Sequence, residues 1–379
     1  MTKTYSFIPP SVRTPIRALA SRFALVAAAC AALAPTASAI SMRDDVPNVN
    51  STGTDNPYVA FGASAAFNAL GFLQAVTPVA GSNPPAFSVG NGTGMLVQTS
   101  TPGVFKYLTA AHNVDNYNSA GTKVPDGVAD APTYDIYFGA ATSADGSTAT
   151  GHVQVTPTSV VVSPQWVSGK NGLAPAASQY DLAVITFSLS MVQSGTVPTA
   201  RLGFSTTSPL GRTGTTVGYG SYGLGNNFAN NNPDGVRRAG NNTIDFAANA
   251  SNPANTGFSL QTDFDSPRDT TKSTLGSAIP LTLEATTAGG DSGGPLLVQD
   301  QNGNYLIAGV LNGGYPGITG GKLSEYGDRS IWASVMDADN MAFLLSQGIA
   351  VPEPSTYALL ALGLTAFAVF ARRRGVAAR

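Results

Sequence analysis

The sequence predicts an all-β protein, and three observations support this prediction. Short strand-like runs recur along the 379-residue chain, separated by turns of glycine, proline and asparagine. The sequence shows neither long amphipathic helices nor a repeat of fixed period. Hydrophobic residues form 43% of the chain and charged residues only 11%. This composition is sufficient for a sizeable core and favours a secreted protein.

The first 39 residues have the three parts of a secretory signal peptide. A basic start precedes an apolar core at residues 23–33, and small residues at 37–39 form a cleavage site. Removal of residues 1–39 would also remove Cys30, the only cysteine, so we expect no disulfide in the mature domain. The basic residues are Arg13, Arg17 and Arg22.

Three strand-like runs stand out in the first half of the chain. The first is residues 104–107, an apolar run. The second is residues 151–155, whose alternation places His152 on one face, so we interpret this histidine as a surface or packing residue. The third is residues 181–187, an apolar strand that opens on an aspartate.

Two segments of the second half are not strand-like. Residues 221–242 are rich in glycine and asparagine, with two arginines near the end. We interpret them as a long surface loop between strands, with a place at the border of a cleft as the alternative. Residues 337–347 are typical of a short helix because apolar residues recur at helical spacing. These are Met341, Leu344 and Leu345.

The most informative stretch is residues 290–295, which read Gly-Asp-Ser-Gly-Gly-Pro. A serine hydroxyl is a weak nucleophile, and it needs an adjacent base and hydrogen-bond donors for the oxyanion that it creates. Glycine has no Cβ, so Gly290 can direct its N–H at that oxyanion beside the N–H of Ser292. A polar turn between strands is the alternative interpretation.

A serine nucleophile requires a base, and the chain has two histidines. His112 follows the strand at 104–107, and His152 has no comparable context, so His112 is the predicted base. Such a serine and histidine act together with an acid as a group of three residues. The acid accepts a hydrogen bond from the ring nitrogen of the histidine that faces away from the serine. We predict Asp181 for this role; the alternatives are Asp115 and Asp135.

The chain order His112, Asp181, Ser292 and the surrounding motifs resemble the trypsin- and chymotrypsin-like serine peptidases. The resemblance covers most of residues 40–350, a single peptidase domain. It implies two packed six-stranded antiparallel β-barrels, divided near residues 190–205, and a short C-terminal helix. Further segments that look like strands of this family are residues 92–97, 216–220 and 307–314.

The resemblance also implies roles for individual residues. The N–H groups of Gly290 and Ser292 would form the oxyanion hole, and Thr286, Asn312 and Gly314 would contact substrate. Thr286 lies six residues before the nucleophile, where trypsins have the acid that selects lysine or arginine. A neutral residue at this position argues against trypsin-like specificity.

Cleavage after Ala39 would make Ile40 the new N-terminus. In trypsin-like enzymes a freed isoleucine or valine amine pairs with the aspartate just before the nucleophile and orders the oxyanion hole. That aspartate is Asp291 in this chain. One hypothesis is therefore that signal cleavage activates the protein through an ion pair between Ile40 and Asp291, and the other is that the leader has no such role.

The C-terminal segment, residues 351–379, has a Pro-Glu-Pro motif, an apolar run at 357–371 and then three arginines. These parts resemble the PEP-CTERM sorting signal of Gram-negative bacteria, in which a membrane enzyme cuts near the motif. About 15 apolar residues is short for a membrane span, and a plain transmembrane anchor is the alternative. Both interpretations predict export to the cell envelope, cell surface or extracellular matrix.

The charge of the mature segment excludes some partners. Residues 1–39 and 351–379 hold eight of the 20 basic and one of the 22 acidic residues, which leaves 12 and 21 and a charge of about −9. Such an acidic domain is not expected to bind nucleic acid. Two distant histidines and no mature cysteine argue against a zinc site, and we expect no cofactor. Calcium bound by loop carboxylates stays open.

Together these features predict a secreted or envelope-sorted serine endopeptidase that hydrolyses peptide bonds through an acyl-enzyme intermediate. Its expected partners are a polypeptide substrate and a membrane sorting enzyme, and we expect a monomer. Two alternatives are a catalytically silent surface or matrix binding protein on the same fold, and an esterase.

Overall fold

The computed structural model describes residues 40–349 apart from 52, 80–85, 116–128, 130, 141–150, 169–178, 232–233, 249–258, 319–320 and 322. The predicted signal peptide and the C-terminal segment lie outside the described residues, so their boundaries stay predictions. No helix within the described ranges is both long and apolar enough to cross a membrane.

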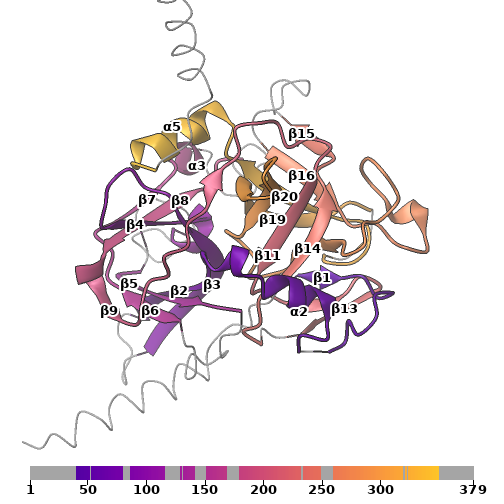
Figure 1. Ribbon diagram of the computed structural model, residues 1–379, viewed down its shortest axis with the longest axis horizontal. Coiled ribbons are helices and arrows are strands. Elements are labelled where there is room, and N and C mark those ends of the chain that lie inside the picture. Colours follow the sequence, from indigo (N-terminus) through magenta and orange to yellow (C-terminus); the bar gives the residue numbers. More distant parts are fainter. Residues whose placement is uncertain are drawn as a thin grey trace, which may run out of the picture.

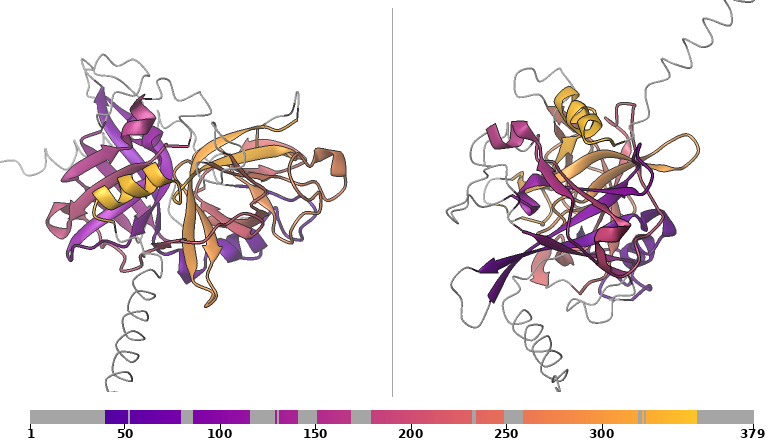
Figure 2. Two further views of the ribbon diagram at one scale, coloured as in Figure 1. Left: turned by 90° about the horizontal axis from the view of Figure 1, so that it is seen from above. Right: turned by 90° about the vertical axis from the view of Figure 1, so that its left-hand side faces the viewer.

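Two curled, mainly antiparallel sheets lie side by side and account for most of the molecule (Figures 1 and 2). The first sheet has eight strands in the order β7-β8-β4-β3-β2-β5-β6-β9. Their bounds are β2 Leu70–Val79, β3 Ala86–Val97, β4 Val104–Thr109, β5 Thr133–Phe138, β6 His152–Val155, β7 Ser159–Val162, β8 Ala183–Ser188 and β9 Val192–Ser194.

The second sheet also has eight strands, in the order β14-β11-β18-β19-β20-β16-β15, with β10 paired to β19. A small four-stranded sheet, β13-β12-β1-β17, lies beside it. The bounds are β1 Ser41–Met42, β10 Gly203–Phe204, β11 Thr213–Gly218, β12 Tyr222–Leu224, β13 Asn227–Asn231, β14 Arg238–Thr243, β15 Phe246–Ala248, β16 Ser259–Asp263, β17 Ala285–Thr286, β18 Pro295–Gln299, β19 Tyr305–Pro316 and β20 Asp328–Ser334.

Helices in the described segments are short, and the longest is the predicted C-terminal one. They are α2 Pro57–Gly62, η1 Ala65–Phe67, η2 Ala111–Asn113, α3 Pro164–Ser168, η3 Leu189–Met191, η4 Thr270–Lys272 and α5 Ala338–Ser346. The predicted all-β class with two antiparallel units is therefore confirmed. Each sheet has eight strands rather than six, and the additional short strands include β9 at one edge of the first sheet and β10, which pairs with part of β19 in the second.

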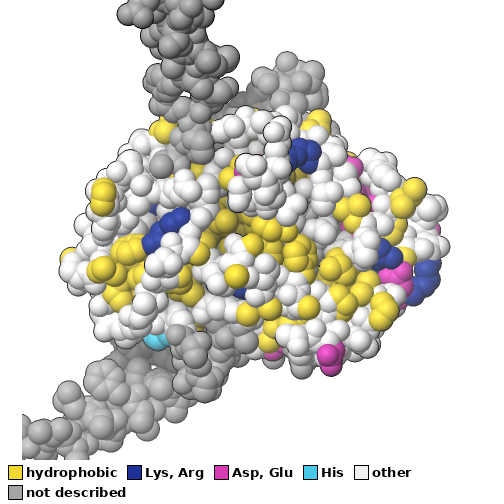
Figure 3. Space-filling view, viewed as in Figure 1, with side chains coloured by type: hydrophobic (Ala, Val, Ile, Leu, Met, Phe, Trp, Pro, Cys, Tyr) yellow, Lys and Arg dark blue, Asp and Glu magenta, His cyan; other side chains and the backbone are white. Residues whose placement is uncertain are grey.

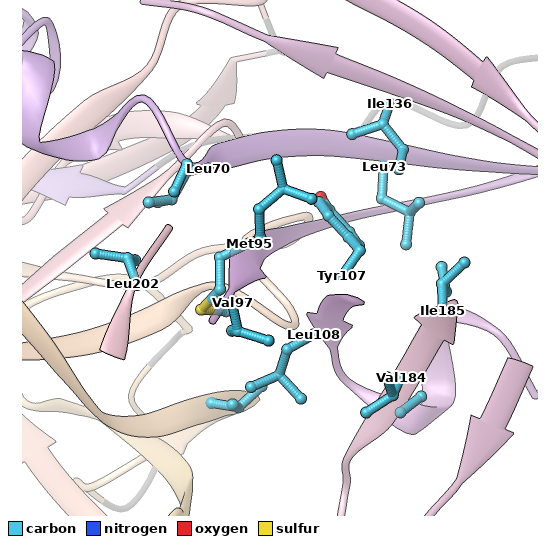
Figure 4. Packing of buried hydrophobic residues seen from close by; sticks show 14 of the residues in the cluster. Leu70, Leu73, Met95, Val97, Tyr107, Leu108, Ile136, Val184, Ile185 and Leu202 are labelled. Atoms are coloured by element: carbon cyan, nitrogen blue, oxygen red, sulfur yellow. The ribbon is translucent and has the colours of Figure 1, made fainter. Parts of the chain in front are cut away.

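The largest core cluster fills the first sheet and continues into the second (Figure 4). Successive strands contribute apolar side chains to it, among them Leu73, Met95 and Ile185, all at most 1% exposed. The one polar group of Tyr107 in this core donates to the carbonyl of Gly71 at 2.7 Å, so burial leaves it satisfied. On the face shown in Figure 3, charged side chains are few and scattered, as the composition predicts.

The prediction of a long loop at 221–242 is wrong, because this segment contains β12, β13 and the start of β14. Arg237 and Arg238 are completely buried. The Arg237 guanidinium donates to the carbonyls of Gly62 and Phe67 at 2.6 Å each, at the ends of α2 and η1. Arg238 pairs with Asp234 at 2.7 Å. The sequence pattern did not indicate these strands because they contain few apolar residues. Buried arginines take the place of part of the usual aliphatic pattern.

Buried acidic side chains gather at the end of β16. Asp263, Asp265 and Glu284 are all at most 4% exposed. Burial, followed by the charge of Asp263, raises the pKa of Asp245 and of Asp265 to about 7 each. Burial also raises the pKa of Glu284 to about 8. Several of these groups are therefore protonated in the folded protein well above the pH at which they ionise in an unfolded chain.

We expect the free energy of unfolding to fall as the pH rises from about 5 to about 8. A carboxyl group with a raised folded pKa stabilises the fold while it is protonated, and this contribution is lost as the pH passes the folded pKa. For Asp265 the loss is on the order of 2 kcal/mol. Urea unfolding at both pH values measures it, with Asp265→Asn expected to flatten the dependence and exposed Asp55→Asn as control. Equal stability of the parent protein at the two pH values would contradict the prediction.

Candidate active site

His112 lies in η2, the single turn that directly follows β4. Thr109 at the end of β4 pairs with Ala183 at the start of β8, and Asp181 lies just before β8. The pairing of these two strands therefore brings the histidine turn and the aspartate together, although 69 positions separate them in the sequence. Asp181 is completely buried, whereas the His112 side chain is 31% exposed.

Asp181 holds His112 through two contacts. Its Oδ2 lies 2.5 Å from Nδ1 of the imidazole, and its Oδ1 accepts from the backbone N–H of His112 at 2.9 Å. Because a carboxylate only accepts, Nδ1 carries the proton and Nε2 is left with a free lone pair. Burial lowers the pKa of His112, but the charge of Asp181 and its hydrogen bond outweigh this effect and raise the pKa above its usual value. The imidazole is thus oriented and basic.

Asn312 makes a third contact with the aspartate, which the sequence did not indicate. Its side-chain amide donates to Oδ2 of Asp181 at 2.6 Å. Asn312 lies in β19, so the acid of the first sheet is also held by a residue of the second sheet. The side chain predicted to contact substrate is thus used to orient Asp181, and substrate binding by this residue stays a prediction.

The second histidine, His152, is the first residue of β6 and pairs there with Tyr137 of β5. His152 Nε2 is 2.8 Å from Oδ1 of Asp135, and the ring stacks on Tyr137 with centroids 4.6 Å apart. Its side chain is 29% exposed, as expected for a surface or packing residue. Asp135, an alternative for the catalytic acid, therefore pairs with His152 and not with His112. No group of three or more histidines, cysteines or acids in the described ranges is suited to a metal ion.

Residues 290–295 form a tight turn that leads into β18. Gly290 and Gly293 have φ angles of 89° and 82°, a region that favours glycine, which explains why this motif needs glycines at these two positions. The Asp291 carboxylate accepts from the backbone N–H groups of Gly220 at 3.0 Å and Ala288 at 2.9 Å. These bonds fix the turn from inside. Ser292, between the two turn glycines, remains partly exposed.

The serine turn is joined to the histidine turn by hydrogen bonds between the two sheets. The carbonyl of Ser292 accepts from the backbone N–H of Thr93 at 2.8 Å and from the side-chain amide of Asn113 at 2.8 Å. Asn113 directly follows His112 in η2, so Ser292 and His112 lie on facing turns. Within the described residues, the N–H groups of Gly290 and Ser292 have no acceptor. The arrangement supplies an oriented base, a serine and two unpaired donors.

Of the remaining predicted substrate residues, Thr286 lies in β17 of the small sheet and Gly314 in β19 of the second sheet. Thr286 is 1% exposed, and its hydroxyl lies 2.9 Å from that of Ser330 in β20. Gly314 pairs with Ser330, and a Cβ at this position would approach the carbonyl oxygen of Arg329 to 2.8 Å. Only glycine fits there without a shift of β20. Substrate contact by Thr286 and Gly314 stays a prediction.

Ile40 is completely buried in a small apolar cluster. The next residue, Ser41, pairs with Gly223 of β12 on one side and with Thr286 of β17 on the other. Asp291 is 1% exposed, forms no ion pair with the described residues, and has its pKa raised to about 7 by burial. The segment that begins at Ile40 is thus held beside β17, which lies just before Asp291 in the sequence. The proposed activating pair stays a prediction, and the mass of the mature N-terminus would test it.

Comparisons with known proteins show two matches to family models. The trypsin-like peptidase domain family matches residues 92–308, and the PEP-CTERM protein-sorting motif matches residues 350–374. No curated protein matches the chain.

Two solved protease structures are similar to this protein. A thermostable serine protease, AL20, from an extremophilic microorganism is 12% identical, with a TM-score of 0.44 over 75% of this chain and 99% of that one. The protease Anisep from Arthrobacter nicotinovorans is 15% identical, with a TM-score of 0.42 over 74% and 95%. At scores below 0.5 neither likeness bears on the function.

Proposed function

The chain belongs to the trypsin-like peptidase domain family, and from this premise we propose that it is a secreted serine endopeptidase. The observation that carries the proposal is the set of hydrogen bonds that connects the two sheets at Ser292. One turn holds His112 oriented by a buried acid, and the facing turn holds a partly exposed serine whose carbonyl is bonded to the residue after that histidine. This combination is what nucleophilic catalysis by serine requires.

In the proposed reaction, Ser292 Oγ attacks the peptide carbonyl while Nε2 of His112 takes the hydroxyl proton. Asp181 stabilises the imidazolium that forms, because its buried carboxylate faces Nδ1. The unpaired N–H groups of Gly290 and Ser292 would donate to the oxyanion. His112 then gives its proton to the leaving amine as the peptide C–N bond breaks. In the second half of the reaction, water gives a proton to His112 and attacks the acyl group, and His112 returns that proton to Ser292 Oγ as the acid product leaves.

An open strand edge supports peptides over small esters as substrates. From Gly313 to Pro316, β19 pairs with β20 on one side, whereas its ladder with β18 ends at Val310. In the described segments, no strand pairs with the second edge of these last residues. An extended substrate backbone can add to this edge as a further strand. Binding of extended main chain at this edge favours a polypeptide over a small ester as the substrate.

The C-terminal PEP-CTERM motif supports a place outside the cytoplasm. We propose that a signal peptide directs the chain to export and that a membrane sorting enzyme processes the tail, which leaves the peptidase domain in the cell envelope or beyond. Fractionation of the producing cells, with the tail deleted at residue 350 as the comparison, tests this route. Retention of both forms in the cytoplasm would contradict it.

Labelling by a fluorophosphonate tests the proposed chemistry. Purified residues 40–350 should react at one serine, and Ser292→Ala should remove the label because no other hydroxyl lies on the turn that faces His112. A peptide-library digest then defines the preferred bonds, and ester hydrolysis without peptide hydrolysis would indicate an esterase. A well-folded protein that does not label would instead favour a binding protein on a peptidase fold.

A further inference from the structure

We propose that Asn113 is a positioning residue that sets the distance between the nucleophile and the base. The inference rests on the proposed function. The Asn113 amide donates to the carbonyl oxygen of Ser292 at 2.8 Å and to Oγ1 of Thr109 at 2.9 Å. The first bond crosses from one sheet to the other, and the second returns to the end of β4. One amide therefore ties the nucleophile residue to the strand that delivers His112.

The direction of this amide is fixed by its partners. The Ser292 oxygen is a carbonyl and can only accept. Oγ1 of Thr109 gives its own proton to the carbonyl of Thr93 at 2.7 Å, so it must accept from Asn113. Both amide protons of Asn113 are thus used, and exchanging its oxygen and nitrogen would place oxygen against oxygen at the Ser292 contact.

The peptide that follows the nucleophile is held at both of its ends. Its oxygen, on Ser292, is bonded by Asn113 and by the backbone of Thr93 in the first sheet. Its N–H, on Gly293, donates to the carbonyl of Leu311 in the second sheet at 2.8 Å. Because a peptide unit is planar, fixing both ends fixes the plane, and with it the backbone that carries the serine hydroxyl.

Two glycines leave the space that the Asn113 amide and its partner Thr109 occupy. A Cβ at position 92 would lie 2.3 Å from Nδ2 of Asn113, so only glycine at that position leaves room. A Cβ on Gly293 would lie 2.2 Å from Oγ1 of Thr109. Gly293 of the serine turn is therefore packed against the end of β4, where the Asn113 amide also bonds.

Asn113→Ala should lower kcat by about 10²-fold, because a misplacement of reacting groups by about 1 Å has an effect of that size. KM should change less than about threefold, and the pH midpoint of kcat/KM should stay unchanged because the pair of His112 and Asp181 is intact. Asn113→Asp should lose more activity, since a carboxylate oxygen would face the Ser292 carbonyl, and its negative charge should move that midpoint to higher pH.

Asn340→Ala is the matched control. The Asn340 amide also donates to two carbonyls, those of Gln179 and Ser334, at 2.8 Å each, but it lies in α5. Its loss should lower stability to a similar extent and leave kcat within about threefold. An equal fall of kcat in both alanine variants, or a kcat for Asn113→Ala close to wild type, would overturn the inference.

Amide hydrogen exchange gives a readout that does not require catalysis. Protection of the Gly293 amide should fall in Asn113→Ala and not in Asn340→Ala, measured against the global stability of each variant. Wild-type protein that fails to label with a fluorophosphonate would count against the proposed function alone, and exchange at Gly293 would then decide the role of Asn113. Unchanged protection in Asn113→Ala would reject that role.

Discussion

Replacing His112 or Ser292 with alanine should lower kcat by about 10⁶-fold. Loss of the nucleophile or of its base from such a group of residues has an effect of this size, because each acts only through the other. The double variant should consequently be no less active than either single variant. Quantitative mass spectrometry of a peptide digest, at enzyme concentrations high enough to detect the residual rate, measures both effects.

The second histidine supplies the matched control for this experiment. His152 also faces an aspartate, at 2.8 Å, but on the outer strands of the first sheet. His152→Ala should keep kcat near the wild-type value. A large loss of kcat in His152→Ala would contradict the assignment of His112 as the base. So would a kcat of His112→Ala above about 1% of the wild-type value, because the expected residual activity is far lower.

Asp181→Asn should lower kcat by about 10⁴-fold with little change in the fold. An amide at this position presents a donor to Nδ1 of His112, which favours the tautomer with the proton on Nε2 and removes the base. The Asp181 carboxylate also accepts from the backbone N–H of His112 on Oδ1 and from the Asn312 amide on Oδ2, at 2.9 and 2.6 Å. An asparagine carboxamide has one acceptor oxygen, so in either orientation its NH2 group faces a donor that the carboxylate satisfies.

Asp135→Asn is the control for this prediction, because Asp135 is the acid of the other pair. The pH profile of kcat/KM separates the two variants. In Asp181→Asn, kcat/KM should no longer rise with pH as His112 loses its proton, whereas in Asp135→Asn this rise should remain. A profile of wild-type shape and height in Asp181→Asn would mean that another acid orients His112.

The sequence was sufficient for those parts of the site in which function is encoded locally. Residues 290–295 need two glycines with positive φ around the serine, and this need is visible as a motif. Asp181 was predicted from its place before an apolar strand and from the residue order of the family that the sequence resembles, and the structure brings it to His112 because that strand pairs with the one before the histidine. Both inferences use short segments whose residue types are restricted by backbone geometry.

The residues that connect the two sheets were not predicted, because their partners are distant in the sequence. Asn113 meets Ser292 from 179 positions away, and Asn312 meets Asp181 from 131. An asparagine carries no sign of which carbonyl it will bond. The strands near Arg237 were missed for a related reason, since the carbonyls that accept from this buried arginine belong to α2 and η1.

The last helix has a consequence for how the protein is made. Phe343 and Leu344 of α5 belong to the core of the first sheet, and Figure 2 shows the helix against that half of the molecule. A growing chain completes all strands of the first sheet long before it reaches these residues, so that core stays open at one side during synthesis. His112 and Asp181 depend on the same sheet. A partly made chain therefore lacks part of the packing around these two residues, and the candidate site is complete only once α5 has been synthesised.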